Sequence, residues 1–598
     1  MGGLFTVDGN GKEKLSARAI GVAAVLFLFA FLPLLNVGYT TNDETHVYYV
    51  LKYSLWTFPA EFLNAFKLAA LSLSRSVRPS LPSELFLPIM GGLGGFYDYP
   101  LIMRVASIIL HAVNVFLFYH LLRFTFRSVR VAYLGVIFFI LFVQNSWDHN
   151  LLVSYFQHLV YFLSLQSSIL LLFLYFKDRE TKMLLLSLIF YFFALSYETI
   201  LMYLPVCMFI SWLETRTWRL RGAGQTVGSF WRPVAYFAGV SVVYLLVYFG
   251  VRAVNADVSV AKITPESFSG YSISGREGRG RRIAETVFCH GISSFPGFVG
   301  IAYHRAVSRY SVLKDFYGTS HLRWLLILAW VIKALLGGYI VRLAVRSIRP
   351  EDVHGLPAFY AIVLGFYLIF APGLPVSIVQ KYQDWVESGV LGFTNTYFSF
   401  YGMMFLIAGI VSYLWVETGK LSVVFRRGAA VIFLMAVVIL SLFTDYSNSA
   451  FTNAQSISNI KWKSVDRFLG SELYRKLPSK SIIYSPSLYE YLGIMKIFPG
   501  YWTDYFAYRA GETYNILDES ALIKRYCEDP RVIFTKPGGR GIMVAGTYEE
   551  LSDLMKKHKR ARLYRLNYVA SPDVDNNISI STFSVSELQG KERTRRSR

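Results

Sequence analysis

Two adjacent carboxylates, Asp43 and Glu44, follow the first apolar run of the chain, in the stretch GYTTNDETHVYYV at 38–50. A carboxylate can act as a general base, taking the proton of a hydroxyl group while that group attacks an electrophilic carbon. So close to an apolar run, such a reaction would take place beside a lipid bilayer. The plainer alternative, that these carboxylates only begin a polar loop, stays open on this stretch alone.

Cations suited to a phosphate group occur at two further places. Arg78 stands before Pro79 at the end of a stretch with helical amphipathic spacing, and its planar guanidinium fork matches the geometry of phosphate oxygens. An ordinary solvated arginine is the alternative there. The basic segment GREGRGRR at 275–282 contains Arg281 and Arg282 and offers the same chemistry.

A third candidate set lies inside the second apolar segment. Its polar side chains recur three, four and three residues apart, a spacing that puts them on one helix face: Arg104, Ser107, His111 and Asn114. That face is not expected to point at lipid. Hydrogen bonding between helices is the structural explanation, and the functional one is that ionisable groups within spans usually face a cavity or a ligand path.

The composition of the chain is that of a membrane protein. It is 54% hydrophobic and 17% aromatic, and its charged fraction of 17% is well below the roughly 25% of an ordinary soluble domain. Apolar runs near the ~20 residues needed to cross the hydrocarbon core recur along the chain. We expect a polytopic α-helical membrane protein with about eleven spans, at 19–37, 101–122, 131–147, 151–176, 183–197, 199–213, 233–251, 322–341, 357–378, 393–416 and 429–445.

The basic residues indicate how these spans are oriented. The net charge is +21, and arginine and lysine cluster in short connections near 123–130, 177–182, 216–232, 342–349 and 420–427. Under the positive-inside rule these connections and the N-terminus are cytoplasmic. The connections near 38–100, 144–150, 252–321 and 379–392 then lie outside, and with them the carboxylates of the first loop and His149. A membrane orientation thus accounts for the positive charge without a nucleic-acid partner.

Glu198 is the only charge in the apolar run Met183–Leu213. Basic connections flank both ends of this run, which favours a hairpin of two short helices that turns near Glu198. A single long tilted helix is the alternative, and it would invert the orientation of everything downstream. An uncompensated charge in a span costs about 2–3 kcal/mol on insertion scales, so a functional role for Glu198 is expected.

The C-terminal segment differs because its apolar runs are short and turn residues are frequent. SIIYS at 481–485, RVIFT at 531–535 and GIMVAG at 541–546 are predicted strands, and Thr547 with Glu550 forms a capping box that opens a helix. We expect a transmembrane domain at 1–445 and a small extracytoplasmic α/β domain at 446–598 that ends in a disordered basic tail. The role of this second domain is not predictable from its sequence.

The three cysteines, Cys207, Cys289 and Cys527, have no metal-ligand spacing. Cys289 and Cys527 would both lie outside, where a disulfide between them is an option. No certain cofactor is predicted, and a divalent metal stays open.

Several motifs, taken in order, resemble the GT-C superfamily of membrane glycosyltransferases. They are TNDE after the first span, Arg78-Pro79 in the long loop, LHAVN at 110–114, SWDHN at 146–150 and ALSYE at 194–198. The similarity covers roughly the first 215 residues. It is nearest to the O-mannosyltransferase type that uses polyprenyl-phosphate sugars, and to related bacterial envelope glycosyltransferases.

The resemblance implies an enzyme of the cytoplasmic (inner) membrane that moves a sugar from a polyprenyl-phosphate carrier to an acceptor on the outer side. It gives Asp43 the role of catalytic base, with Glu44 as its substitute, and gives site roles to Arg78 and Glu198. The chain departs from the O-mannosyltransferase pattern at Tyr197, where a lysine often stands, and it lacks the C-terminal helical repeats. The sugar and the acceptor, whether glycan, lipid or protein, are therefore not implied.

The chemistry of such a transfer agrees with the residue types. It needs a base for the acceptor hydroxyl, cations for the leaving phosphate and an apolar groove for the prenyl chain. Asp43 supplies the first and the aromatic-rich helices the third. The candidates for holding the donor phosphate or the substrate are Arg78, Arg104, His111, His149, Arg281 and Arg282.

Two other functions remain open at this point. An O-antigen ligase or polymerase type of enzyme would rely on arginine and histidine of the late outside loop, such as Arg281, Arg282, His290 and His304. A flippase or transporter of lipid-linked glycans would use Arg104 and Glu198 as pathway charges. Against a transporter, no internal inverted repeat is visible in the sequence.

Overall fold

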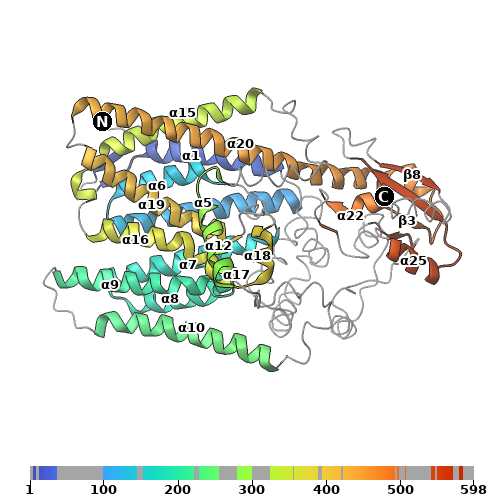
Figure 1. Ribbon diagram of the computed structural model, residues 1–598, viewed down its shortest axis with the longest axis horizontal. Helices are drawn as coiled ribbons and strands as arrows, with labels where there is room; N and C mark the ends of the chain where they lie inside the picture. Colours follow the sequence, from blue (N-terminus) through green and yellow to red (C-terminus); the bar gives the residue numbers. More distant parts are fainter. Residues whose placement is uncertain are drawn as a thin grey trace. The chain divides into compact units, whose positions relative to one another are not determined.

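The computed structural model describes residues 4–7, 13–36, 99–144, 153–220, 228–254, 279–298, 324–353, 356–387, 394–418, 422–491, 495–496, 506, 541–545, 548–569 and 578–582. They form two compact units, one with most of the described residues up to 452 and one with those from 453 on. The first unit is a bundle of helices that run side by side (Figure 1). The second unit contains a small sheet, and each unit is considered by itself below.

The helical unit begins with a short hairpin and then contains helices in chain order. The hairpin pairs β1 (Phe5–Val7) with β2 (Glu13–Leu15). The first half contains α1 (Ala17–Phe31), η1 (Leu32–Asn36), α5 (Tyr99–Phe126), α6 (Val129–Phe142), α7 (Val153–Asp178), α8 (Thr181–Ala194), η3 (Glu198–Tyr203), α9 (Leu204–Leu220) and α10 (Gly228–Val254). The second half contains α12 (Arg279–Ile292), α15 (Trp324–Ser347), η7 (Pro350–Asp352), α16 (Leu356–Phe370), η8 (Ala371–Gly373), α17 (Leu374–Ser377), α18 (Gln380–Glu387), α19 (Thr394–Thr418) and α20 (Val423–Gly470).

Seven helices of the described part are long and apolar enough to cross a membrane: 17–35, 104–126, 158–178, 230–249, 324–347, 396–418 and 423–449. Shorter apolar helices occur at Val129–Phe142, Thr181–Ala194 and Ala361–Ser377. The protein is therefore an integral multi-pass membrane protein. Each predicted span overlaps one of the helices given above, while the number of crossings stays a prediction.

The apolar run around Glu198 folds as a hairpin, and the alternative of one long tilted helix is wrong. α8 ends at Ala194 and the chain continues through η3 into α9. At the turn, the Tyr197 ring lies 4.7 Å from the His158 ring near the start of α7. At the far end of α9, Glu214 forms an ion pair of 3.2 Å with Arg127, which follows the end of α5. α9 therefore returns to the end of the bundle where α8 began.

Predicted cytoplasmic connections meet at one end of the bundle. Arg130 at the start of α6 forms ion pairs with Glu13 of β2 and, at 3.0 Å, with Asp352 of η7. Arg349 lies 3.7 Å from the same Glu13 carboxylate. These contacts join the N-terminal hairpin, the α5–α6 turn and the α15–α16 connection. Connections that are all cytoplasmic must lie on the same side of the membrane, and these three lie at the same end of the bundle.

α16 and α19 pack closely because two glycines face each other across their contact. A Cβ atom at Gly365 would lie 2.8 Å from the backbone nitrogen of Leu406, and one at Gly402 would lie 2.7 Å from the backbone carbon of Leu368. A larger side chain would force the two backbones apart. Small residues at helix contacts are the usual way in which helices associate within lipid.

The second unit contains the end of α20, α21 (Glu472–Arg475), α22 (Pro486–Tyr489), α25 (Tyr548–Lys557), a sheet of four strands, and a short pair of β4 (Glu490–Tyr491) with β5 (Met495–Lys496). The sheet has the order β6 (Met543–Ala545), β3 (Ile482–Tyr484), β7 (Leu563–Tyr568) and β8 (Ile578–Thr582). β3 is parallel to both β6 and β7, and β8 is antiparallel to β7. α25 buries Leu551 against Ile482, Met543 and Ala545.

The predicted strands at 481–485 and 541–546 and the helix after Thr547 are confirmed as β3, β6 and α25. RVIFT at 531–535, Thr547 itself and the basic tail lie outside the described residues. The helix that contains the predicted span 429–445 is longer than that span, because α20 continues to Gly470. The residues after 445 are polar enough to end an apolar run, yet they do not interrupt a helix.

Candidate functional site

The structure describes only some of the predicted site residues. The side chains of Arg104, His111, Arg281 and Arg282 are described, whereas Asp43, Glu44, Arg78 and His149 lie outside the described residues. For Glu198 the backbone is described, at the first position of η3, and the side chain is not. Contacts of candidate site residues are therefore known around α5, η3 and α12.

The polar face of α5 is buried, as its spacing predicts. Arg104 is 6% exposed, and Ser107, His111 and Asn114 are 2%, 1% and 0% exposed. Apolar residues cover the opposite face, where Ile109 is 57% exposed. Because the exposed face of a membrane helix meets lipid, the polar face of α5 must be held by neighbouring helices.

Arg104 connects α5 to the end of the first helix. One guanidinium nitrogen, Nη1, donates a hydrogen bond of 2.6 Å to the carbonyl oxygen of Leu35 in η1. The last carbonyls of a helix have no partner within the helix and carry partial negative charge, so a cation there is favourable. The arginine is thus located where the chain leaves the first helix and enters the loop that contains TNDE.

His111 and Asn114 belong to a hydrogen-bonded cluster between α5, α7 and α19. His111 Nδ1 and the Tyr397 hydroxyl are 3.3 Å apart, and that hydroxyl is 2.8 Å from the hydroxyl of Tyr401. Gln166 donates to the side-chain oxygen of Asn114 at 3.1 Å, and Asn114 donates to the Leu159 carbonyl. Hydrogen bonding between helices, the structural explanation for these polar residues, is therefore present for Asn114 and His111.

The start of η3 is packed among aromatic rings. Tyr197, directly before Glu198, is buried, stacks on Phe398 of α19 at 5.6 Å and lies edge-on to His158. η3 also contacts η8 and α17, the segments that follow α16. The position where the O-mannosyltransferase pattern often has a lysine is thus filled here by a packed aromatic ring.

α12 presents its arginines to carboxylates. Arg281 forms an ion pair of 2.6 Å with Glu285 one turn further on, and Arg282 forms one of 2.9 Å with Glu387 of α18. His290 on the same helix is buried, and burial lowers the pKa of its imidazole to about 4. The buried imidazole is therefore neutral near pH 7, and the two arginines are held in solvent-exposed ion pairs.

A buried ion pair between α15 and α20 was not predicted from the sequence. Lys333 Nζ is 2.6 Å from Asp445 Oδ1, and the two side chains are only 1% and 7% exposed. Lys333 also reaches the Leu141 carbonyl at the end of α6, at 3.4 Å. A signal was present, because Lys333 is the only charged residue in the predicted span 322–341 apart from Arg323 at its edge, and Asp445 ends another predicted span.

α20 continues this polar contact toward the end of α6. Its buried polar residues lie at helical spacing on one face: Ser441, Thr444, Asp445, Asn448 and Ser449. Asn448 donates to the Val143 carbonyl at 2.8 Å. Gln144, which follows Val143 in the chain, donates a hydrogen bond of 2.8 Å to the Phe295 carbonyl beyond α12. Lys333 and Asn448 thus cap carbonyls that the end of α6 leaves without helical partners.

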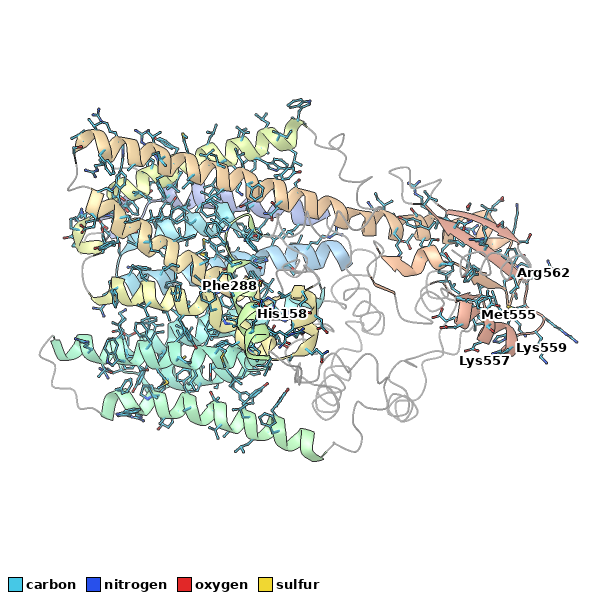
Figure 2. The ribbon with its side chains drawn as sticks, viewed as in Figure 1. His158, Phe288, Met555, Lys557, Lys559 and Arg562 are labelled. Atoms are coloured by element: carbon cyan, nitrogen blue, oxygen red, sulfur yellow. The ribbon has the colours of Figure 1, made fainter. Side chains whose placement is uncertain are left out.

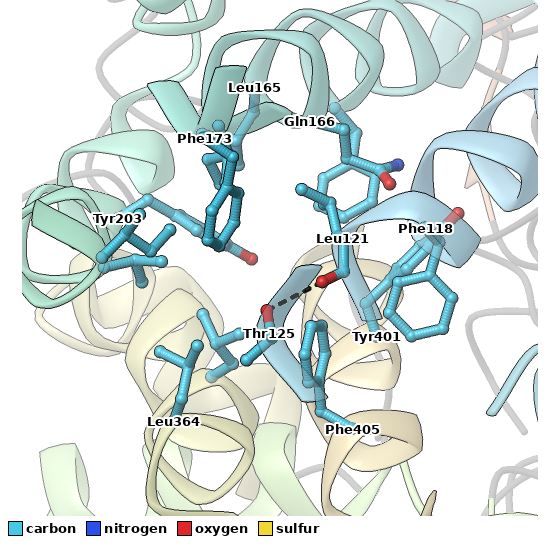
Figure 3. A pocket seen from close by; sticks show the side chains of 15 residues that line it. Phe118, Leu121, Thr125, Leu165, Gln166, Phe173, Tyr203, Leu364, Tyr401 and Phe405 are labelled. Carbon is cyan, nitrogen blue, oxygen red and sulfur yellow. Dashed lines mark hydrogen bonds between the residues drawn. The ribbon is translucent and has the colours of Figure 1, made fainter. Parts of the chain in front are cut away.

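A small cavity lies between α5, α7, α9, α16 and α19 (Figure 3). Its volume is about 40 Å³, and Phe118, Phe162, Leu364 and Phe405 are among its largely apolar lining. The Tyr203 hydroxyl points into it and has no hydrogen-bond partner among the described residues. Ligand pockets usually measure about 300–1,000 Å³, so this cavity suits a few water molecules rather than a prenyl chain.

Within the described part of the chain, no group of three or more His, Cys, Asp or Glu residues is arranged to hold a metal ion. Cys207 and Cys289 are free thiols there, and Cys527 lies outside it.

No protein-family model matches the chain, and no curated protein sequence matches it. The geometry therefore offers one cation next to the exit of the first helix and a sheltered polar cluster behind it, while the predicted base Asp43 lies outside the described residues.

Proposed function

We propose that this protein is a GT-C type glycosyltransferase, which transfers a sugar from a polyprenyl-phosphate donor to an acceptor on the outer side of the cytoplasmic membrane. One observation carries the proposal: the hydrogen bond of 2.6 Å from Arg104 to the Leu35 carbonyl. It ties a buried cation to the entrance of the loop with Asp43 and Glu44. A base and a phosphate-binding cation are the two groups that such a transfer needs at one site.

The reaction would be a direct displacement at the anomeric carbon. The acceptor hydroxyl forms the new bond to that carbon while its proton passes to the Asp43 carboxylate; Glu44 is the alternative candidate for this base. The bond from the anomeric carbon to the phosphate oxygen breaks, and its electron pair leaves with the polyprenyl phosphate. Arg104 and Arg78 would stabilise the charge on the leaving phosphate. The acceptor class, glycan, lipid or protein, is left open by these residues.

The proposal includes the finer architecture expected from the sequence. Eleven helices would cross the membrane, with a catalytic domain at 1–445 and an extracytoplasmic domain at 446–598. Glu198, the first loop, the α12 region and the C-terminal unit would share the outer side. The meeting of basic connections at one end of the bundle supports this orientation, because Arg130 and Arg349 both reach Glu13.

A reporter fusion tests the orientation. Alkaline phosphatase fused after Gly470, where α20 ends, is expected to be active, because this enzyme folds only outside the cytoplasm. The same reporter fused after Thr418, where α19 ends, should be inactive. Each fusion is expressed in its own strain. An inactive fusion after Gly470 together with an active fusion after Thr418 would overturn the proposed orientation.

The transfer itself is tested with purified protein in lipid nanodiscs and radiolabelled polyprenyl-phosphate sugars. We expect sugar to move to envelope acceptors, and Arg104→Gln to lower the rate about 10²- to 10³-fold, as losing a transition-state donor typically does. Arg427→Gln is the matched control, because Arg427 is exposed at the start of α20, at the end opposite to Arg104. Equal rates for both variants would separate Arg104 from the chemistry.

Glu198→Gln is expected to lower transfer about ten- to a hundredfold while leaving the amount of folded protein unchanged, because a charge retained in an apolar run is expected to be functional. The measurement is the transfer rate next to the melting temperature in detergent. Thr199→Val is the control, because it changes the next residue of the same turn without removing a charge. Full activity together with higher stability would make Glu198 only a tolerated turn residue.

The competing ligase or polymerase reading receives less support from α12. It would use Arg281, Arg282 and His290, whereas His290 is buried with its pKa lowered to about 4 and the arginines already contact Glu285 and Glu387. If the protein were a transporter, it would move a labelled lipid-linked glycan across the membrane without forming a glycosidic bond. Formation of a glycosidic bond in the nanodisc assay would exclude a pure transporter, and the Asp43 variant separates the two enzyme types.

A further inference from the structure

The second unit carries a cluster of positive charge that the proposed transfer does not use. The run KKHKRAR at 556–562 follows the apolar part of α25 and leads into β7. Lys557, Lys559, Arg560 and Arg562 are exposed. Figure 2 shows Lys557, Lys559 and Arg562 at the same side of this unit, with Met555 on the helix beside them.

The parallel strands add a further cation to this cluster. Ile482 is paired with Leu563 and with Met543, so β3, β7 and β6 begin at one edge of the sheet. The Ile482 amide donates to the Arg562 carbonyl at 2.9 Å, and Lys480 stands just before β3. The basic edge, defined as Lys480, Lys557, Lys559, Arg560 and Arg562, is thus built from two distant parts of the chain.

The charges of the basic edge are not neutralised within the described part of this unit. Lys556 forms an ion pair of 3.4 Å with Asp553, but no ion pair is found there for the five members of the basic edge. The helix dipole favours cations in the last turn of α25, which accounts for Lys557. It does not account for Lys480, Arg560 or Arg562, which lie outside the helix.

The basic edge is poorly suited to insert into a bilayer. An interfacial helix needs a free apolar face, and the apolar face of α25 is used in the core, where Leu551, Leu554 and Met555 pack with Ile482 and Met543. Lys480 and Arg562 stand before β3 and β7, neighbouring strands that lie about 4.8 Å apart, and the other three cations lie at the end of α25 and in the turn after it. A cluster of exposed cations without an apolar face matches an extended chain of repeated negative groups.

We propose that the basic edge binds an acidic polysaccharide, a glycan chain with repeated phosphate, sulfate or carboxylate groups. The inference uses the outer location proposed for this unit, where such chains occur, but the binding does not require sugar transfer. Because the contact is between exposed charges, its affinity should fall steeply as salt rises.

The test uses full-length protein in nanodiscs of zwitterionic lipid, with fluorescent dextran sulfate as the probe and uncharged dextran as its neutral counterpart. We expect dextran sulfate alone to bind. The variant Lys557→Gln/Lys559→Gln/Arg562→Gln should bind it at least about tenfold more weakly. The control, Lys463→Gln/Arg467→Gln/Lys476→Gln, removes three exposed cations of the same unit, two on α20 and one directly after α21, and should bind like the wild type.

Each result decides the proposal. Equal weakening in both triple variants would show that only net charge matters and would overturn a defined edge, as would equal binding of neutral dextran. Binding to vesicles with 30% phosphatidylglycerol but not to dextran sulfate would replace the glycan with a membrane surface. An unchanged melting temperature in both variants excludes unfolding as the cause, and the transfer assay on Asp43 and Arg104 variants reports separately on the proposed enzyme.

Discussion

Replacing Asp43 by asparagine is expected to abolish sugar transfer, with a loss of about 10²- to 10⁴-fold, the usual cost of removing a general base. The asparagine amide keeps the size of the side chain and cannot accept the proton of the acceptor hydroxyl. Insertion into the membrane and binding of the lipid donor should change little, because neither needs that proton acceptor. The measurement compares the single-turnover transfer rate with donor binding in the same nanodisc preparation.

The neighbouring carboxylate supplies the control for this experiment. Glu44→Gln has the same change of charge one residue further along the chain, so a difference between the two variants identifies the base. If Glu44→Gln is inactive and Asp43→Asn transfers at the wild-type rate, the two roles are exchanged. Activity in both variants would make the proposed mechanism wrong, and a ligase-type site would then be the better explanation.

The second large effect is expected on stability, at the buried ion pair of α15 and α20. Lys333→Met should lower the free energy of unfolding by about 3–5 kcal/mol, because it leaves the Asp445 carboxylate buried without its cation. The Lys333–Asp445 distance is 2.6 Å and both side chains are almost completely buried. The same change also removes the contact to the Leu141 carbonyl at the end of α6.

A double variant separates the pair from ordinary packing. Lys333→Met/Asp445→Leu replaces both charges by apolar groups, and buried pairs replaced in this way often lose little or no stability. We therefore expect it to recover most of the loss in a denaturation experiment in detergent micelles. Lys177→Met is the control, since Lys177 is 65% exposed and 4.0 Å from Asp178, and exposed pairs contribute about 0–1 kcal/mol. Equal losses in the single and double variants would contradict the proposed role of the pair.

Some features of this protein follow from spacing within one segment. The apolar runs predicted the helices, and the run around Glu198 turns where its charge and its basic flanks indicated. The three- and four-residue spacing on α5 predicted that Arg104 and His111 are buried while Ile109 is exposed. Such features can be predicted because the helical period alone determines which side chains share a face.

The partners of those side chains were decided by the tertiary structure. Arg104 binds the Leu35 carbonyl, His111 lies against Tyr397, and Lys333 pairs with Asp445, each across a long stretch of sequence. Helices within lipid associate through close packing and polar contacts rather than through the hydrophobic effect. An apolar residue that faces lipid therefore looks the same in the sequence as one that faces another helix.

The same division holds in the second unit. β3 and β6 were predictable because their apolar residues form short buried runs, and α25 because a capping box marks its start. β7 and β8 were not, because most of their residues are only partly buried. The run KKHKRAR is visible in the sequence, but its junction with Lys480 is not. Only the parallel pairing of β3 with β7 brings these charges to one edge, since strand pairing depends on contacts between distant segments that the local pattern does not encode.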